Sequence, residues 1–278
     1  MINKACTYIP LIILLYSSLL GAQPRCPQAI SIGLHEFGLF FHKNKGIDAD
    51  LVQELARRSR CEFNIQVLIR AQIWHELKNG SLMMSVSGLQ AVDREQFVYF
   101  SEPYLIQKNM AVLPAAIAAQ YPEPKDFLAA PKLRWGKVKS FLHGEQLEPF
   151  IRQLTNQQRI DEAQDSQQLF EWLRAGKVQG ILAHPAAYTY YLRHIPFDHR
   201  PAIRDWAPAD RGIAARLVFS KQHFSTQDIQ AWNALLREIR DDGTLERILG
   251  RYLPDFEVQR ILNHPLAAGQ NKSPKSSK

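Results

Sequence analysis

The sequence has few of the features that usually accompany catalysis, metal binding or nucleic-acid binding. Its histidines, including His184, His194 and His199, have no metal-ligand spacing with cysteine or carboxylate residues. It contains neither a glycine-rich phosphate loop nor a nucleophile triad pattern. The formal net charge of +7 falls by four to +3 when Lys4 and the lysines at 272, 275 and 278 are left out, a small excess for nucleic-acid binding. We therefore expect no catalytic residues, no metal, no cofactor and no nucleic-acid partner.

Long apolar runs are also scarce, because only residues 8–20 form one. This run follows Lys4 and is followed by a Gly-Ala pair ending at Ala22 and then by polar residues. It is shorter than the roughly 20 residues of a membrane-spanning helix, and the arrangement is typical of a signal peptide. We expect residues 1–22 to be a signal peptide and the remaining chain to lie in the periplasm. A retained N-terminal anchor is the alternative, because Leu20 is bulky for a residue near a cleavage site.

Cysteine is rare, with three residues in the whole chain. Cys6 falls within the predicted signal peptide, so Cys26 and Cys61 remain. In an oxidising compartment such a pair predicts one disulfide, and two buried free thiols are the alternative. Both cysteines precede predicted strands, so parallel pairing of those strands would place them at the same edge of a sheet.

Strand and helix patterns alternate along the chain. Residues 29–34 and 62–68 have strand patterns, and Ile47, Leu51 and Leu55 repeat every four residues in a helix pattern over 47–57. The alternation predicts helix-covered, mainly parallel sheets. After a proline-rich stretch at 122–132 it restarts, with a helix expected from about Glu145. We assign 23–110 and 213–264 to a first lobe, 111–212 to a second lobe, and 265–278 to a disordered basic tail.

Four blocks occur together in a recognisable order, at residues 46–51, 93–104, 175–182 and 241–245. They resemble the family 3 solute-binding proteins, the polar-amino-acid-binding type of ABC importers. The resemblance implies the type II periplasmic binding fold, in which two α/β lobes are joined by two hinge crossings. Periplasmic binding proteins are a well-known example of hinge closure, so the resemblance also implies lobes that close around a ligand in the cleft between them.

The resemblance implies that Arg94 grips a ligand carboxylate, since a guanidinium can donate two parallel hydrogen bonds to it. An exposed arginine paired with Asp93 or Glu95 is the alternative. Ser87 stands where the family places a residue that cradles the ligand's polar end. Leu89, which would take a similar part, departs from that pattern because it has no hydroxyl.

Further positions implied by the resemblance differ from the family pattern or allow two interpretations. His184 replaces the aspartate that pairs with a ligand ammonium, and a structural histidine is the alternative. Gly144 fits a helix start that faces the ligand, whereas Glu145 would repel an anion there. Phe40 and Phe41 stand where a ring covers the ligand, and the alternative places them in the lobe core.

The resulting hypothesis is a monomeric periplasmic protein that is not an enzyme. It would capture a small polar solute bearing a carboxylate, such as an amino acid or a related compound. It would deliver this solute to an ABC permease or another inner-membrane partner. One alternative is a sensing module that acts through a membrane partner. Another is an enzyme resembling cyclohexadienyl dehydratase, with Glu145 or Glu36 as general acid or base.

Overall fold

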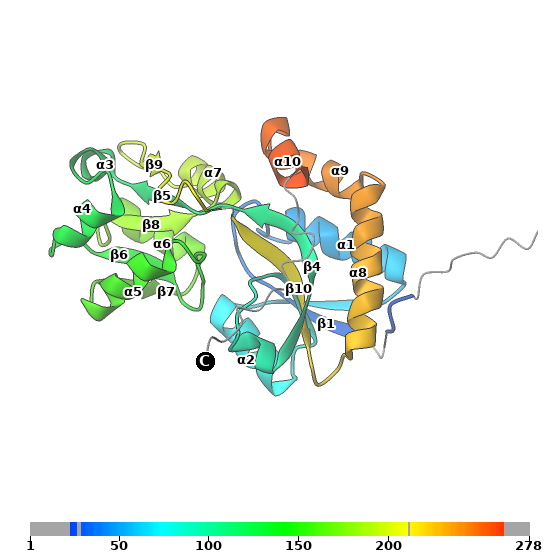
Figure 1. Ribbon diagram of the computed structural model, residues 1–278. Helices are drawn as coiled ribbons and strands as arrows, with labels where there is room; N and C mark the ends of the chain where they lie inside the picture. The colour runs from blue at the N-terminus through cyan, green and yellow to red at the C-terminus, as the bar shows by residue number, and fades with distance from the viewer. Residues whose placement is uncertain (1–22, 27–28, 211, 264–278) are drawn as a thin grey trace, which may run out of the picture.

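The computed structural model describes residues 23–26, 29–210 and 212–263, so the predicted signal peptide and the predicted tail lie outside the described residues. The described chain forms two lobes, each built on one five-stranded sheet (Figure 1). No described helix combines the length and the apolar character needed to cross a membrane.

The sheet of lobe 1 has the strand order β2-β1-β3-β10-β4. β1 lies parallel to β2 and β3, whereas β10 lies antiparallel to β3 and β4. The strands are β1 (Ile30–Leu34), β2 (Phe63–Val67), β3 (Met84–Gly88), β4 (Val98–Gln107) and β10 (Ile213–Ser220). The helices are α1 (Ile47–Ser59), α2 (Arg70–Asn79), the short 3-10 helix η1 (Arg94–Gln96), α8 (Thr226–Asp241), α9 (Thr244–Gly250) and α10 (Asp255–Leu262).

The sheet of lobe 2 repeats this plan in the order β7-β6-β8-β5-β9. β6 lies parallel to β7 and β8, and β5 lies antiparallel to β8 and β9. The strands are β5 (Met110–Leu113), β6 (Trp135–Val138), β7 (Ile160–Ala163), β8 (Gly180–Ala183) and β9 (Ala202–Arg204). The helices are α3 (Ala115–Gln120), α4 (Pro124–Ala129), α5 (Glu148–Asn156), α6 (Ser166–Arg174) and α7 (Pro185–His194).

The two-lobed α/β prediction is confirmed, but both sheets are mixed rather than mainly parallel. The antiparallel pairs involve the strands next to the two crossings between lobes. The chain leaves lobe 1 at the end of β4 and enters lobe 2 at β5, and it returns from β9 to β10. A strand that arrives from the other lobe has no helical crossover within its own sheet, so it is free to pair antiparallel.

Apolar residues cover both faces of each sheet. In β5, Ala111 and Leu113 belong to one core cluster and Val112 to another, as the two-residue period of a strand requires. The first of these clusters contains the ring stack of Trp135 on Trp206. In lobe 1, the buried Trp232 of α8 packs against β10. The C-terminal helices therefore complete the core of lobe 1, beside which they lie in Figure 1.

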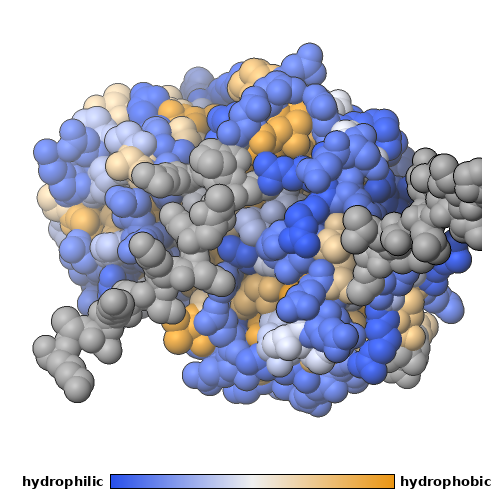
Figure 2. Space-filling model, turned by 45° about the vertical axis from the view of Figure 1, so that its right-hand side comes forward, coloured by the Kyte–Doolittle hydropathy of each residue, from blue (hydrophilic) through white to orange (hydrophobic). Residues whose placement is uncertain are grey.

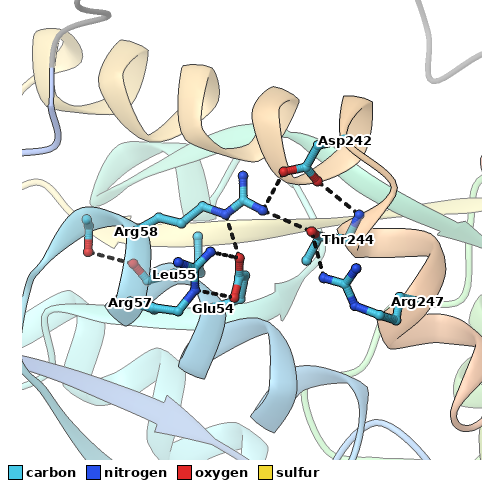
Figure 3. Close-up of polar contacts among 8 residues, drawn as sticks. Glu54, Leu55, Arg57, Arg58, Asp242, Thr244 and Arg247 are labelled. Atoms are coloured by element: carbon cyan, nitrogen blue, oxygen red, sulfur yellow. Dashed lines mark hydrogen bonds and ion pairs between the residues drawn. The ribbon is translucent and has the colours of Figure 1, made fainter.

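A polar network fastens these C-terminal helices to α1 (Figure 3). Arg58 donates to Glu54 within α1. It also pairs with Asp242 at the end of α8, at 2.6 Å, and donates to the hydroxyl of Thr244 at the start of α9, at 2.9 Å. Arg247 donates to the same hydroxyl at 3.0 Å. The return segment is thus held to lobe 1 by charge as well as by apolar packing.

Cys26 and Cys61 form a disulfide, as predicted, with 5.4 Å between their Cα atoms. The bridge ties the segment before β1 to the segment before β2, two parallel neighbours.

On the face shown in Figure 2, hydrophilic residues predominate and hydrophobic ones form small separate patches.

Candidate ligand-binding site

A cavity of about 50 Å³ lies between the lobes, and residues of both lobes form its walls. Beside it, a hydrogen bond from Arg94 of lobe 1 to the Ser140 carbonyl of lobe 2 joins the two lobes. Lobe 1 and the crossings contribute His35, Phe37, Arg70, Ser87, Leu89, Arg94, Gln107, Asn109, Ile213 and Ala215. Lobe 2 contributes Val138, Ser140, Phe141, Leu142, His143, Ser166, Leu169, Phe170, Leu182, Ala183, His184 and Ala187.

Arg94 lines this cavity from η1 and is buried, with 6% of the residue exposed. Its Nη1 donates to the Leu89 carbonyl at 3.0 Å in its own lobe, and its Nη2 donates to the Ser140 carbonyl at 2.6 Å in lobe 2. The guanidinium carbon lies 4.0 Å from the ring centroid of Trp74. Burial lowers its pKa to about 10, so Arg94 remains a cation at neutral pH. It therefore places a positive charge in the cavity and links the lobes.

Ser87 also lines the cavity, at the end of β3, with a φ of +51°. Its hydroxyl donates to the carboxylate of Asp48, 2.8 Å from Oδ2, and its amide donates to the Tyr104 hydroxyl at 2.8 Å. The Tyr104 hydroxyl donates to the same carboxylate at 3.2 Å. Burial raises the pKa of Asp48 to about 7, although both hydroxyls oppose that shift. Ser87 thus has its own donors engaged within lobe 1.

His184 stands at the end of β8 and at the start of α7, and His35 follows β1 in the other lobe. Both are buried and line the cavity, and no ring nitrogen of either has a hydrogen-bond partner among the described residues. Burial lowers the pKa of His184 to about 3. Burial, with further repulsion from Arg70 and His184, lowers the pKa of His35 well below its usual value. Each histidine is therefore neutral and offers one donor and one acceptor.

Arg70, the first residue of α2, is a charged cavity residue that the sequence patterns did not single out. It is 4% exposed, and its Nη2 donates to the Ser87 carbonyl at 2.8 Å. Its Nη1 is buried without a partner among the described residues. Its guanidinium carbon lies 5.1 Å from the Trp74 ring centroid, one helical turn along α2. Burial and the nearby Arg94 lower its pKa to about 9, with Asp48 opposing the shift.

The sequence model of the bacterial extracellular solute-binding proteins, family 3, matches residues 36–255. The chain belongs to this family.

Solved structures agree on the fold. An ancestral arginine-binding protein, bound to arginine, is 16% identical, with a TM-score of 0.69 over 83% of this chain and 100% of its own. AncCDT-1, an ancestral amino-acid-binding precursor of cyclohexadienyl dehydratase, is 15% identical, with a TM-score of 0.66 over 81% and 96%. The VFT2 domain of BvgS from Bordetella pertussis is 16% identical, with a TM-score of 0.62 over 81% and 93%. No curated protein sequence matches the chain.

The other residues considered as ligand contacts, Phe40, Phe41, Gly144 and Glu145, do not line the cavity. Phe40 and Phe41 are each 1% exposed and lie in the core of lobe 1, although the Phe40 ring makes a T-shaped contact with the His184 ring. Phe37, three residues before Phe40, lines the cavity instead and meets His184 at 4.4 Å between ring centroids.

Gly144 and Glu145 likewise do not line the cavity. Gly144 has a φ of +97°, and a side chain there would meet Asp210 and Ile213. Glu145 is exposed, and α5 begins at Glu148 rather than at about residue 145. The helix start that was expected to face a ligand is therefore displaced from the site.

A second hollow, of about 130 Å³, adjoins the cavity and shares His35, Arg70 and Val138 with it. Exposed Val67 and Ile69 also line it, so it opens to solvent beside β2. Its two carboxylates are already engaged. Glu36 pairs with His42 at 2.7 Å, and Asp165 accepts from the amide of Gln168 at 2.8 Å as the cap of α6.

The inner cavity is consequently electropositive. Its described lining holds two guanidinium groups, from Arg70 and Arg94, and no carboxylate. Apolar side chains such as Phe141 and Phe170 form much of the remaining wall. Charges buried among such side chains interact strongly with any charged group that enters.

Proposed function

We propose that this protein captures a small carboxylate-bearing solute between its lobes in the periplasm and delivers it to an ABC-type permease. The observation that carries the proposal is the position of Arg94, a buried cation at the meeting point of both lobes. A carboxylate is the group that a guanidinium binds best, through paired charge-assisted hydrogen bonds.

Closure follows from the distribution of polar groups between the lobes. Arg94 belongs to lobe 1, whereas Ser140 and His184 belong to lobe 2. A solute that contacts both sets interacts with more groups when the lobes are closed. Binding therefore shifts the protein toward the closed form, which gives a permease a distinct surface to recognise.

Related structures support a small polar ligand, since one of them is an arginine-binding protein bound to arginine. Arginine itself suits this chain poorly, because its own guanidinium would approach Arg70 and Arg94 in a cavity whose described lining has no carboxylate. His184, a neutral ring where an ammonium partner was expected, adds no negative charge.

The enzymatic alternative gains no support from the two glutamates nominated for it. Glu145 is exposed and lies away from the cavity, and Glu36 pairs with His42 in the outer hollow. General acid or base catalysis needs a group within hydrogen-bond reach of the reacting atom. The likeness to the BvgS VFT2 domain is one of fold, so it assigns no sensing residue.

A thermal-shift screen with the purified protein tests solute capture. The panel contains amino acids, opines, polyamines and small organic acids. A solute present at about 100 times its dissociation constant should add about 2.7 kcal/mol of stability. We expect Arg94→Ala to abolish the shift and the exposed Arg57→Ala to retain it. If no compound stabilises the wild-type protein, or if Arg94→Ala binds the solute as tightly, the assignment is wrong.

A further inference from the structure

The strongest unexplained feature of the inner cavity is the side chain of Arg70. Its Nη1 is buried without a partner among the described residues, whereas its Nη2 is held by the Ser87 carbonyl. The residue is 4% exposed and lines the cavity wall. A buried donor without a partner costs free energy, so the site is built to receive an acceptor.

A second buried positive charge increases this demand. Arg70 and Arg94 both lie against the Trp74 ring, with guanidinium carbons 5.1 Å and 4.0 Å from its centroid. Two like charges so close in a buried region repel each other. Asp48 compensates only in part, because the hydroxyls of Ser87 and Tyr104 already occupy its carboxylate. One carboxylate group on a ligand would leave one of the two guanidinium groups uncompensated.

Among the described residues, the same cavity offers an ammonium group no carboxylate partner, only neutral acceptors such as the Gln107 side-chain oxygen. Its described lining contains no aspartate or glutamate. His35 and His184 present four ring nitrogens without partners among the described residues, and a neutral imidazole can donate one hydrogen bond to a carboxylate oxygen. Phe37 and Phe141, also in the lining, supply apolar walls suited to a short carbon chain.

We propose that the cavity selects a small dicarboxylate without an ammonium group, one carboxylate being bound at Arg94 and the other at Arg70. This proposal rests on the proposed function, because it names the solute class that the same site captures. The two histidines complete the hydrogen bonds to the carboxylate oxygens. Selectivity against amino acids follows from the missing carboxylate in the described wall.

Isothermal titration of the purified protein with matched solutes tests the proposal. Succinate and glutarate are compared with butyrate and valerate, which lack one carboxylate, and with L-aspartate and L-glutamate, which add an ammonium group. We expect a dicarboxylate to bind at least tenfold more tightly than its monocarboxylate and amino-acid counterparts. The comparison needs no variant, so it does not depend on whether a substituted protein folds.

Arg70→Gln then tests the second anchor, with the exposed Arg57→Gln as the matched control. In Arg70→Gln we expect dicarboxylate affinity to fall at least tenfold, to the level of the monocarboxylate, while Arg57→Gln binds as the wild type does. Tighter binding of L-aspartate, L-glutamate or L-arginine would overturn the dicarboxylate proposal but leave solute capture standing. Failure of every compound here and in the thermal-shift panel would overturn both.

Discussion

Replacing Arg70 by methionine should stabilise the ligand-free protein while removing an anion-binding group. Arg70 is a buried cation with one hydrogen bond to the Ser87 carbonyl and one nitrogen without a partner among the described residues. Methionine has a similar length and flexibility, and it carries no charge that must lose its hydration in the fold. Replacement of poorly compensated buried charges by apolar residues is often stabilising.

The magnitude follows from the environment of Arg70. Burial lowers its pKa from 12.5 to about 9, which corresponds to a cost of about 5 kcal/mol for the charged side chain. Methionine would forgo the charge-assisted bond to Ser87, worth about 2 kcal/mol, and the contact with Trp74, worth about 1–2 kcal/mol. The balance is a gain of about 1–2 kcal/mol in the free energy of unfolding. For a chain of this size that is roughly 2–8 °C in melting temperature.

Urea denaturation and thermal melting at pH 7 without added solute provide the test. Arg57→Met, on the exposed side of α1, is the control and should leave stability nearly unchanged, as surface substitutions usually do. If Arg70→Met has a free energy of unfolding equal to or below that of the wild type, Arg70 is already well compensated. The argument for an anionic partner would then lose its energetic basis.

Two further predictions concern the disulfide and pH. The Cys26–Cys61 bridge spans a sequence separation of 35, and the loss of chain entropy in the unfolded state assigns it roughly 4 kcal/mol of stability. The Cys26→Ser/Cys61→Ser protein should therefore have a free energy of unfolding lower by about that amount in urea denaturation. A loss below about 1 kcal/mol would contradict this. Burial lowers the pKa of His184 to about 3, against 6.5 for the exposed residue. Between these values the unfolded chain binds the proton and the folded one does not, so His184 should cost about 2 kcal/mol of stability between pH 7 and 5. His184→Gln should lose less than the wild type over that interval, and equal losses would refute the assignment. Asp48, whose raised pKa of about 7 acts in the opposite direction, is present in both proteins and leaves the comparison intact.

The sequence was sufficient for the two-lobed architecture, because the amphipathic periods and the spaced blocks are local properties. Pairing of Cys26 with Cys61 was also predictable, since both precede strands that lie parallel. Strand direction was not, because it depends on where the chain crosses between lobes. β10 lies antiparallel to β3 because the chain returns to it from the other lobe. No short sequence pattern encodes that crossing.

The candidate site was predictable only where a block supplied the position. Arg94, Ser87 and His184 line the cavity, whereas Arg70 does not stand out among the chain's many basic residues. Its burial depends on contacts with Ser87 and Phe141, distant along the chain. A helix that places an arginine four residues before a tryptophan, as Arg70 and Trp74 do, is the one signal that could have drawn attention to it.

The loop after β1 shows a further limit. His35, Phe37, Phe40 and Phe41 are all aromatic and lie within seven residues, so their composition does not tell which ring faces the cavity. The path of the backbone decides, and it turns at Gly38, where φ is +59° and the Ala186 carbonyl lies close. That turn sends Phe37 to the cavity and Phe40 and Phe41 to the core.

The hydrogen bond from Arg94 to the Ser140 carbonyl also has a kinetic consequence. It joins the lobes directly, so it must break each time the cleft opens. A solute enclosed in the cavity can leave only after that event, whatever contacts it makes itself. The opening rate would therefore set an upper bound on the dissociation rate of a solute held there. The residence time of a solute would then depend in part on a hydrogen bond between two protein groups, the Arg94 guanidinium and the Ser140 carbonyl.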